Sequence, residues 1–280
     1  MKLIVALLLL WSFAYSNASS AGLSTTGAVV ALARRMIQSS KTEDVEDMAI
    51  LPYHCDLAAS YGQLNNETIK NMDRNLLIAI AGLNKRIVAV RRNLGNTIIT
   101  FRDYVSLMNQ NVLLVPDNST EIFREKFLGY EDYRLATTDK QEEVVEEVTN
   151  WFTNELINDP DVLADTKIEI VDYANIVAAT GAKIKGFRTL ILRNHYVERS
   201  VVDMGVLRYP DLNKPYFKLF RIQLFAYRQS KAVLFMQKDT SGIRGQYQSM
   251  VFVPNEAVIA KLKQATKIRA ANEALEMFNE

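Results

Sequence analysis

The residue types that carry most enzyme chemistry are scarce in this chain. It contains two histidines, His54 and His195, and a single cysteine, Cys55. A structural zinc ion needs four nitrogen or sulfur ligands and a catalytic one usually needs three protein ligands, so the sequence predicts no metal site. His54 and Cys55 are adjacent, which turns their side chains apart in an extended chain, so a thiol–imidazole pair would need the fold to bring Cys55 to His195.

Other patterns that indicate catalysis are also missing. The sequence has no G-x-S-x-G, no phosphate-binding glycine loop and no dinucleotide fingerprint. The paired acids Glu142–Glu143 and Glu146–Glu147 are four residues apart, a spacing that places them on the hydrated surface of a helix. We therefore expect a protein that is not an enzyme and that uses no cofactor. A hydrolase with an unrecognised nucleophile, for which Cys55 is the only indication, is the weakest alternative.

The start of the chain has the three-part pattern of a secretory signal peptide. A lysine precedes the apolar run Leu3–Phe13, and small residues follow it. The run has 11 residues, whereas a transmembrane helix needs about 20. The sequence thus predicts a signal peptide over 1–20 and a secreted, extracellular protein. Two sequons make Asn66 and Asn118 glycosylation candidates in surface loops.

Charge and cysteine content limit the partners and the sources of stability. Lys and Arg number 33 against 32 Asp and Glu, so the net charge is only +1. A balance of this kind gives no global attraction to nucleic acid or to an anionic membrane, and we expect no nucleic-acid partner. One cysteine cannot form an internal disulfide, so stability must come from burial.

Apolar residues at spacings of three, four and seven predict several amphipathic helices, which we expect to face a core rather than to insert into a membrane as a helical hairpin. The clearest one carries a capping box at its start and an acidic first turn. The predicted helices cover Ser24–Ser40, Asn66–Asn93, Ile98–Met108, Thr138–Leu156 and a terminal segment from Asn255.

The stretch from Tyr216 to Pro254 has the period-two alternation of a β-sheet. The glycines within Asp239–Gly245 predict a hairpin turn with positive φ angles. Earlier extended segments are predicted over Lys167–Ala178 and Lys183–Tyr209, with a turn at Asp203–Gly205. The strands predicted in the main stretch are Tyr216–Tyr227, Lys231–Lys238 and Gln246–Val253, and their predicted core residues are Phe220, Ile222, Leu224, Val233, Phe235, Val251 and Val253.

The order of these elements predicts the fold class. Helices come first, strands follow in succession and one helix ends the chain, which favours an α+β fold with an antiparallel sheet flanked by α-helical layers. We expect one such domain over 94–280, preceded by a helical N-terminal arm or pro-region over 21–93. The first predicted strand has 12 residues and spans roughly 40 Å at about 3.3 Å per residue, longer than usual.

Four colinear blocks between Leu94 and Pro254 carry a resemblance to a known family. They are Asn111–Asp117, Val145–Thr149 with Thr153–Leu156, Phe220–Ile222, and Val233–Asp239 followed by Gln248–Ser249 and Phe252–Pro254. Together they resemble the cytolytic delta-endotoxin (Cyt) family. The order of helices before strands is also similar to the α-β-α sandwich of that family.

The resemblance implies a secreted, membrane-active protein that binds membrane lipid directly, inserts strands to form pores or to perturb the bilayer, and forms a homo-oligomer on membranes. It also implies a removable N-terminal pro-region, and it makes the seven predicted core residues membrane-insertion candidates. Two features depart from the family: the mature segment before Leu94 is longer than usual, and the crystal-forming members lack such a signal peptide. The alternative is a non-lytic relative that holds a lipid or another hydrophobic ligand in an apolar pocket.

Overall fold

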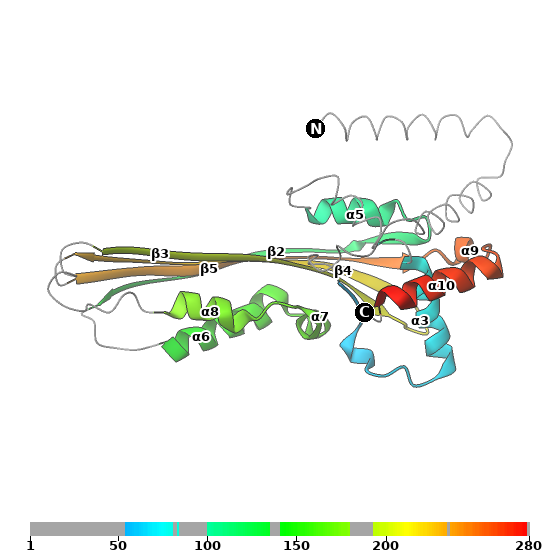
Figure 1. Cartoon of the computed structure of the whole chain (residues 1–280), viewed down its shortest axis with the longest axis horizontal. Helices are drawn as coiled ribbons and strands as arrows, with labels where there is room; N and C mark the ends of the chain where they lie inside the picture. The colour runs from blue at the N-terminus through cyan, green and yellow to red at the C-terminus, as the bar shows by residue number, and fades with distance from the viewer. Residues whose placement is uncertain are drawn as a thin grey trace, which may run out of the picture.

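The computed structural model describes residues 54–80, 83, 100–134, 141–179, 193–233 and 236–278. In these residues a five-stranded sheet has helices packed on both of its faces (Figure 1). The predicted α+β class is confirmed by this arrangement. The expected signal peptide over 1–20 and the expected helix over Ser24–Ser40 lie outside the described residues.

The sheet consists of one short and four long strands in the order β1-β3-β4-β5-β2. β1 runs parallel to β3 and all other neighbours are antiparallel, so the sheet is mixed rather than wholly antiparallel as predicted. The long strands have 17 to 21 residues, which corresponds to roughly 55 to 70 Å at about 3.3 Å per residue. The strands are β1 His54–Leu57, β2 Leu114–Arg134, β3 Arg193–Tyr209, β4 Tyr216–Val233 and β5 Met236–Pro254.

Two of the helices begin at capping residues that elementary helix chemistry favours. Thr100 and Asp103 form a reciprocal capping box at the start of α5, and Asp159 accepts a hydrogen bond from the backbone at the start of α7. The α-helices are α3 Glu67–Ile80, α5 Phe101–Asn109, α6 Gln141–Asn150, α7 Pro160–Asp165, α8 Ile170–Ala178, α9 Glu256–Ile259 and α10 Gln264–Phe278, with a π-helix η4 at Trp151–Ile157 and a 3-10 helix η3 at Ala59–Tyr61.

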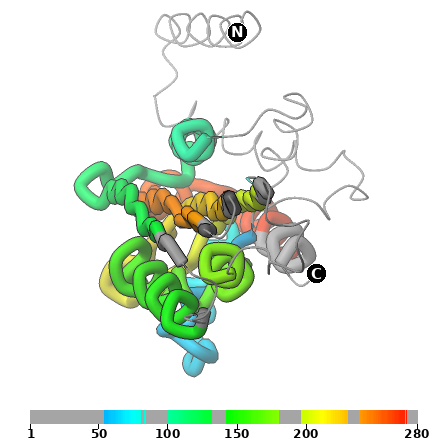
Figure 2. Tube along the Cα trace, turned by 90° about the vertical axis from the view of Figure 1, so that its left-hand side faces the viewer, coloured from blue at the N-terminus to red at the C-terminus, as the bar shows by residue number. Residues whose placement is uncertain are grey.

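The first face of the sheet is covered by α6, η4, α7 and α8. As the alternation in β4 predicts, Phe220, Ile222 and Leu224 are all fully buried on this face. Figure 2, seen from the left of Figure 1, shows α6 and α8 on one side of the row of strands and α5 on the other. η4 comes so close that a Cβ on Gly245 would lie 2.4 Å from Leu156 Cδ2, so glycine is required there.

In the described part of the chain, α3, α5, α9 and α10 cover one half of the second face, where β4 begins and β5 ends. We call this the inner half and the remainder the outer half. In the inner half, Leu219 of β4 and Phe252 of β5 pack with Leu76, Met108 and Leu262 in a second hydrophobic core. β1 and α3 come from the segment that was expected to be a separate arm, yet they belong to this sheet and this core. Each of the two hydrophobic cores therefore contains residues from before and from after residue 94.

The predicted hairpin turn at Asp239–Gly245 is wrong. These residues lie inside β5, and β4 continues to Val233, which pairs with Met236. Neither Gly242 nor Gly245 takes a positive φ. The two glycines instead give room to side chains of neighbouring elements that lie over them, which is the other common reason for glycine within a strand.

Two further predictions fail in the same region of the chain. Residues Ile170–Ala178, predicted as extended, form α8, because their apolar positions pack against the sheet as a helix. The predicted turn at Asp203–Gly205 lies inside β3. β2 was not predicted as a strand, and its large exposed surface and many charged residues explain why its alternation is weak.

Candidate functional site

β1 places His54 on the first face of the sheet and Cys55 on the second. His54 pairs in register with Gly205 of β3, and its ring occupies the space that a side chain at residue 205 would fill. The imidazole also packs against Phe220 in an edge-on contact, with ring centroids 5.6 Å apart. Cys55 is buried in the core of the second face. The side chains point apart as predicted for adjacent residues of an extended chain.

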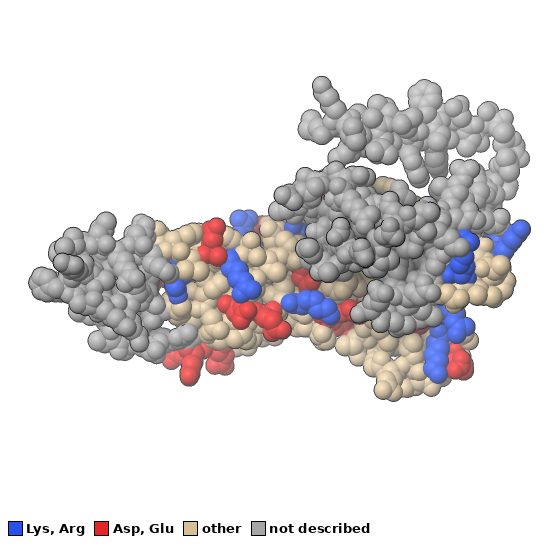
Figure 3. All heavy atoms as spheres, in the orientation of Figure 1, with Lys and Arg blue, Asp and Glu red and all other residues tan. Residues whose placement is uncertain are grey.

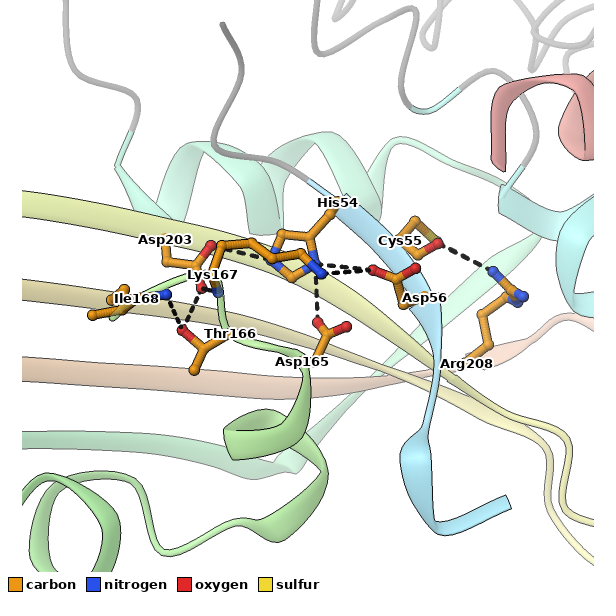
Figure 4. A network of polar contacts seen from close by, with 9 residues as sticks. All are labelled: His54, Cys55, Asp56, Asp165, Thr166, Lys167, Ile168, Asp203 and Arg208. Carbon is orange, nitrogen blue, oxygen red and sulfur yellow. Dashed lines mark hydrogen bonds and ion pairs between the residues drawn. The ribbon is translucent and has the colours of Figure 1, made fainter. Parts of the chain in front are cut away.

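Three carboxylates surround the imidazole of His54 (Figure 4). Nδ1 lies 2.9 Å from Asp165 Oδ2 and 3.3 Å from Asp56 Oδ2, and Nε2 lies 3.1 Å from Asp203 Oδ1. Asp56 is two residues along β1, Asp165 ends α7 and Asp203 lies on β3. We call these four residues the His54 cluster. They come from three elements, so the cluster depends on the complete fold.

A second layer of hydrogen bonds holds Asp203 in place. Its Oδ2 accepts hydrogen bonds from the Thr166 hydroxyl at 2.6 Å and from the backbone N–H of Lys167 at 3.0 Å. The ammonium group of Lys167 lies 3.7 Å from Asp56 Oδ2. These contacts attach the connection between α7 and α8 to β3, and hence the helical layer to the sheet.

The electrostatics of the cluster favour positive charge at the ring. Burial acts to lower the pKa of His54, but Asp165, Asp203 and Asp56 outweigh it and raise the pKa to about 11. The hydrogen bond to His54 lowers the pKa of Asp56 to about 2, against its partial burial. Burial raises the pKa of Asp165, and it also opposes the lowering of the pKa of Asp203 that His54 and Thr166 cause. The site is therefore an anionic cluster that favours a positive charge at the ring.

This cluster was not predicted, because the sequence shows no compact group of acids around a histidine. Asp203 lies 149 residues from His54 along the chain, so only the fold brings them together. The one local signal is the spacing of His54 and Asp56, which puts both side chains on the same face of a strand.

The pairing of Cys55 with His195 is excluded by the strand register. Cys55 pairs with Val206, whereas His195 pairs with Ser230 near the other end of β3, roughly 35 Å away at about 3.3 Å per residue. The thiol is buried, and burial raises the pKa of Cys55 to about 12. A buried neutral thiol of this kind is a poor nucleophile.

The predicted insertion candidates occupy different environments. Phe220, Ile222 and Leu224 are fully buried on the first face, whereas Val251 and Val253 are only half-buried, so the prediction that the two valines are core residues is wrong. The first face becomes polar toward this end, as the 2.7 Å ion pair between the Lys218 and Asp159 side chains shows. The side chain of Val233 and the whole of Phe235 lie outside the described residues.

The outer half of the second face carries large aromatic side chains. Phe123 and Phe127 of β2 are 58% and 60% exposed. Phe225 and Tyr227 of β4 are half-buried and stack with centroids 6.1 Å apart. We call these four residues the aromatic patch. Strand register places Phe127 and Phe225 on either side of Arg244 in one row across the sheet.

Arg221 lies at the inner border of the aromatic patch, because it and Phe123 both pair with Gln248. The residue is 6% exposed, and its guanidinium donates a hydrogen bond to Gln223 Oε1 at 2.9 Å. Its Nε has no hydrogen-bond partner, and within the described part of the chain Arg221 forms no ion pair with a carboxylate. Burial lowers the pKa of Arg221. Among the described residues, it is thus a buried cation without a carboxylate partner.

The charged side chains visible on one face of the described part form no large region of one sign (Figure 3). On the face shown in Figure 3, acidic and basic side chains are interspersed along the described part. A shallow pocket of about 370 Å³ between β2 and α6 is lined by Leu128 and Trp151 but also by four glutamates, so it differs from the apolar pocket that the ligand-binding alternative requires.

Both glycosylation candidates are exposed. Asn66 caps α3, since its Oδ1 accepts a hydrogen bond from the backbone N–H of Ile69 at 2.8 Å, and Asn118 lies on the edge strand β2. The amide nitrogen, to which a glycan would be attached, is not the atom that makes the cap.

No family model matches the chain, and no curated protein matches it. Among the helices in the described ranges, none is both long and apolar enough to cross a membrane.

Proposed function

We propose that this protein is a secreted, non-enzymatic, membrane-active protein that contacts lipid through the aromatic patch. The observation that supports the proposal is the exposure of Phe123 and Phe127 on the edge strand β2. Large apolar and aromatic side chains beside basic ones are typical of surfaces that lie at the membrane–water interface. The neighbouring Arg244 and Gln246 on β5 supply the polar part of that pattern.

The resemblance to the Cyt family supports the second part of the proposal, which is that strands insert after the helical cover leaves. Phe220, Ile222 and Leu224 form a continuous apolar row, but α6 to α8 bury it completely. Insertion therefore requires that these helices separate from the first face. The His54 cluster is one of the contacts that must break, because Asp165 and Thr166 join the helical layer to the sheet through it.

The edges of the sheet support oligomerisation on the membrane. In the described part of the chain, β2 has no strand on its outer side, and β1 covers only Gly205–Arg208 of β3. β2 and β3 are antiparallel to each other, so β2 of one copy can pair with β3 of the next copy in the usual antiparallel manner. Backbone groups in hydrocarbon must all be hydrogen-bonded, so inserted strands need such a neighbour.

Co-sedimentation of the purified mature protein with liposomes, followed by dye release, tests the proposal. Wild-type protein is expected to bind vesicles and to release dye. Replacing both Phe123 and Phe127 with serine is expected to weaken binding at least about tenfold, because each phenylalanine contributes about 1.5–3 kcal/mol when it is buried. The Leu212→Ser variant is the matched control, since Leu212 is 56% exposed but lies in the loop between β3 and β4.

The outcomes separate the two parts of the proposal. Failure of wild-type protein to bind vesicles of neutral and anionic composition would overturn it. Binding without dye release, with or without proteolytic trimming, would keep lipid binding and reject pore formation, which leaves the non-lytic alternative. Chemical cross-linking is expected to give oligomers only when vesicles are present.

A further inference from the structure

The His54 cluster has the atoms of a metal-binding site on one side of the imidazole. Nδ1 and the two oxygens Asp56 Oδ2 and Asp165 Oδ2 all lie within 4.8 Å of one another. Zinc bonds to imidazole nitrogen and carboxylate oxygen are about 2.0–2.2 Å long, which in a tetrahedron separates the ligand atoms by about 3.3 Å. The distances of 3.3 Å and 2.9 Å from Nδ1 to Asp56 and Asp165 require shifts of only a few tenths of an ångström.

The other side of the imidazole has the support that metal-binding histidines usually have. Such a histidine donates its second ring N–H to a carboxylate, which fixes the tautomer and the orientation of the ring. Here Nε2 lies 3.1 Å from Asp203 Oδ1, and Asp203 is itself held by the Thr166 hydroxyl and the Lys167 backbone. The ring is therefore oriented with Nδ1 toward Asp56 and Asp165.

Asp165 is the most buried acid beside Nδ1 and has few partners of its own. Its side chain is 7% exposed, and its Oδ2 has no hydrogen-bond partner among the described residues other than the His54 ring, whose Nδ1 lies 2.9 Å away. A ring nitrogen carries at most one proton, so Nδ1 cannot donate to both Asp56 and Asp165. One of the two acids is therefore left without a donor from the ring, and a shared cation would satisfy both at once.

We propose that His54 Nδ1, Asp56 and Asp165 bind one divalent transition-metal ion of the zinc class. The charges match, since three carboxylates and the Lys167 ammonium leave two negative charges when the imidazole is neutral. Binding releases the Nδ1 proton to water, and the ion takes its place. Calcium and magnesium fit less well because they prefer ligand sets made of oxygen only. The bound ion ties β1 and the end of α7 together across β3.

Isothermal titration of the chelator-treated, dialysed full chain with Zn²⁺ tests the proposal, with Ca²⁺ and Mg²⁺ as comparison ions. One Zn²⁺ per chain is expected, and the melting temperature should rise with Zn²⁺ only. Asp165→Asn is expected to abolish this binding, and Asp203→Asn to weaken it by about 10–100-fold. Asp172→Asn is the matched control, because Asp172 is an exposed acid paired with Arg199 on the neighbouring helix α8.

A second measurement on wild-type protein remains informative if a variant does not fold. The chain has only two histidines, so NMR of protein labelled at histidine nitrogen gives one signal set for the site and one internal control. Zn²⁺ is expected to shift the His54 signals and to leave those of His195 unchanged. His54 signals that stay unchanged at saturating Zn²⁺, or equal binding by folded Asp165→Asn protein, would overturn the proposal.

Discussion

The imidazole of His54 lies directly against the backbone of Gly205, and a Cβ atom at residue 205 would come within 2.7 Å of His54 Cε1 and 2.6 Å of Phe220 Cζ. Glycine at this position is thus a condition for the site. It lets a short edge strand place a polar ring on an apolar face, where three carboxylates reach it.

Gly205→Ala is expected to displace the His54 ring and to lower the free energy of unfolding by about 1–3 kcal/mol, since the added methyl overpacks a buried contact. Urea unfolding monitored by circular dichroism measures the change. Gly129→Ala is the control, because the Cβ there meets only the ring of Phe127, which is 60% exposed and can move. Equal losses in the two variants would show that His54 does not depend on the space at residue 205.

Leu224→Asp is expected to cost several kcal/mol, because it places an unpaired charge in the fully buried first face. Gln223→Asp is the matched control, since the preceding residue of the same strand is half-buried on the opposite face. Thermal melting of both variants against wild type is the measurement. A Leu224→Asp protein that melts like wild type would contradict the assignment of the two faces.

Sequence patterns predicted what depends on neighbours in the chain and missed what depends on the fold. The alternation of Phe220, Ile222 and Leu224 correctly gave the buried face of β4. The glycines of β5 were wrongly predicted to form a turn. A glycine that makes room for a neighbouring side chain and a glycine that turns the chain look the same in sequence. α8 was misassigned because its β-branched residues favour strands locally, whereas packing against the sheet makes it a helix.

The site itself could not be predicted for the same reason. Asp165 and Asp203 reach His54 only because β1 pairs in parallel with β3 and because α7 ends above that pair. Neither the pairing of a four-residue strand nor the place where a short helix ends has a strong sequence signal. Exposure of Phe123 and Phe127 also depends on which half of the sheet the helices cover.

Cys55 is expected to react slowly with iodoacetamide in native protein at pH 8 and rapidly in urea. Burial raises the pKa of its thiol to about 12, so the reactive thiolate is scarce until the pH approaches that value, and access is blocked as well. Mass spectrometry of the labelled protein follows the reaction. Fast labelling of native protein would show that β1 does not stay paired with β3.

Arg221→Met is expected to have opposite effects on stability and on lipid binding. Replacing a buried cation that has no carboxylate partner among the described residues with an apolar side chain of similar length should leave stability unchanged or raise it by about 1–4 kcal/mol. Arg221 reaches lipid phosphate only when the surface beside Phe123 opens on the membrane, and on that basis the preference for anionic over neutral vesicles should fall in the variant. Liposome co-sedimentation and thermal melting provide the two readouts, and an unchanged lipid preference would remove Arg221 from the proposed surface.

An environment-sensitive fluorophore can report whether the outer half of the second face meets lipid. The label is attached to the single thiol of a Phe127→Cys, Cys55→Ala protein, and to that of a Leu212→Cys, Cys55→Ala control, because Phe127 and Leu212 are similarly exposed. Adding vesicles is expected to shift the emission at residue 127 to shorter wavelength and to leave the emission at residue 212 unchanged. No shift at residue 127 with either neutral or anionic vesicles would contradict the account.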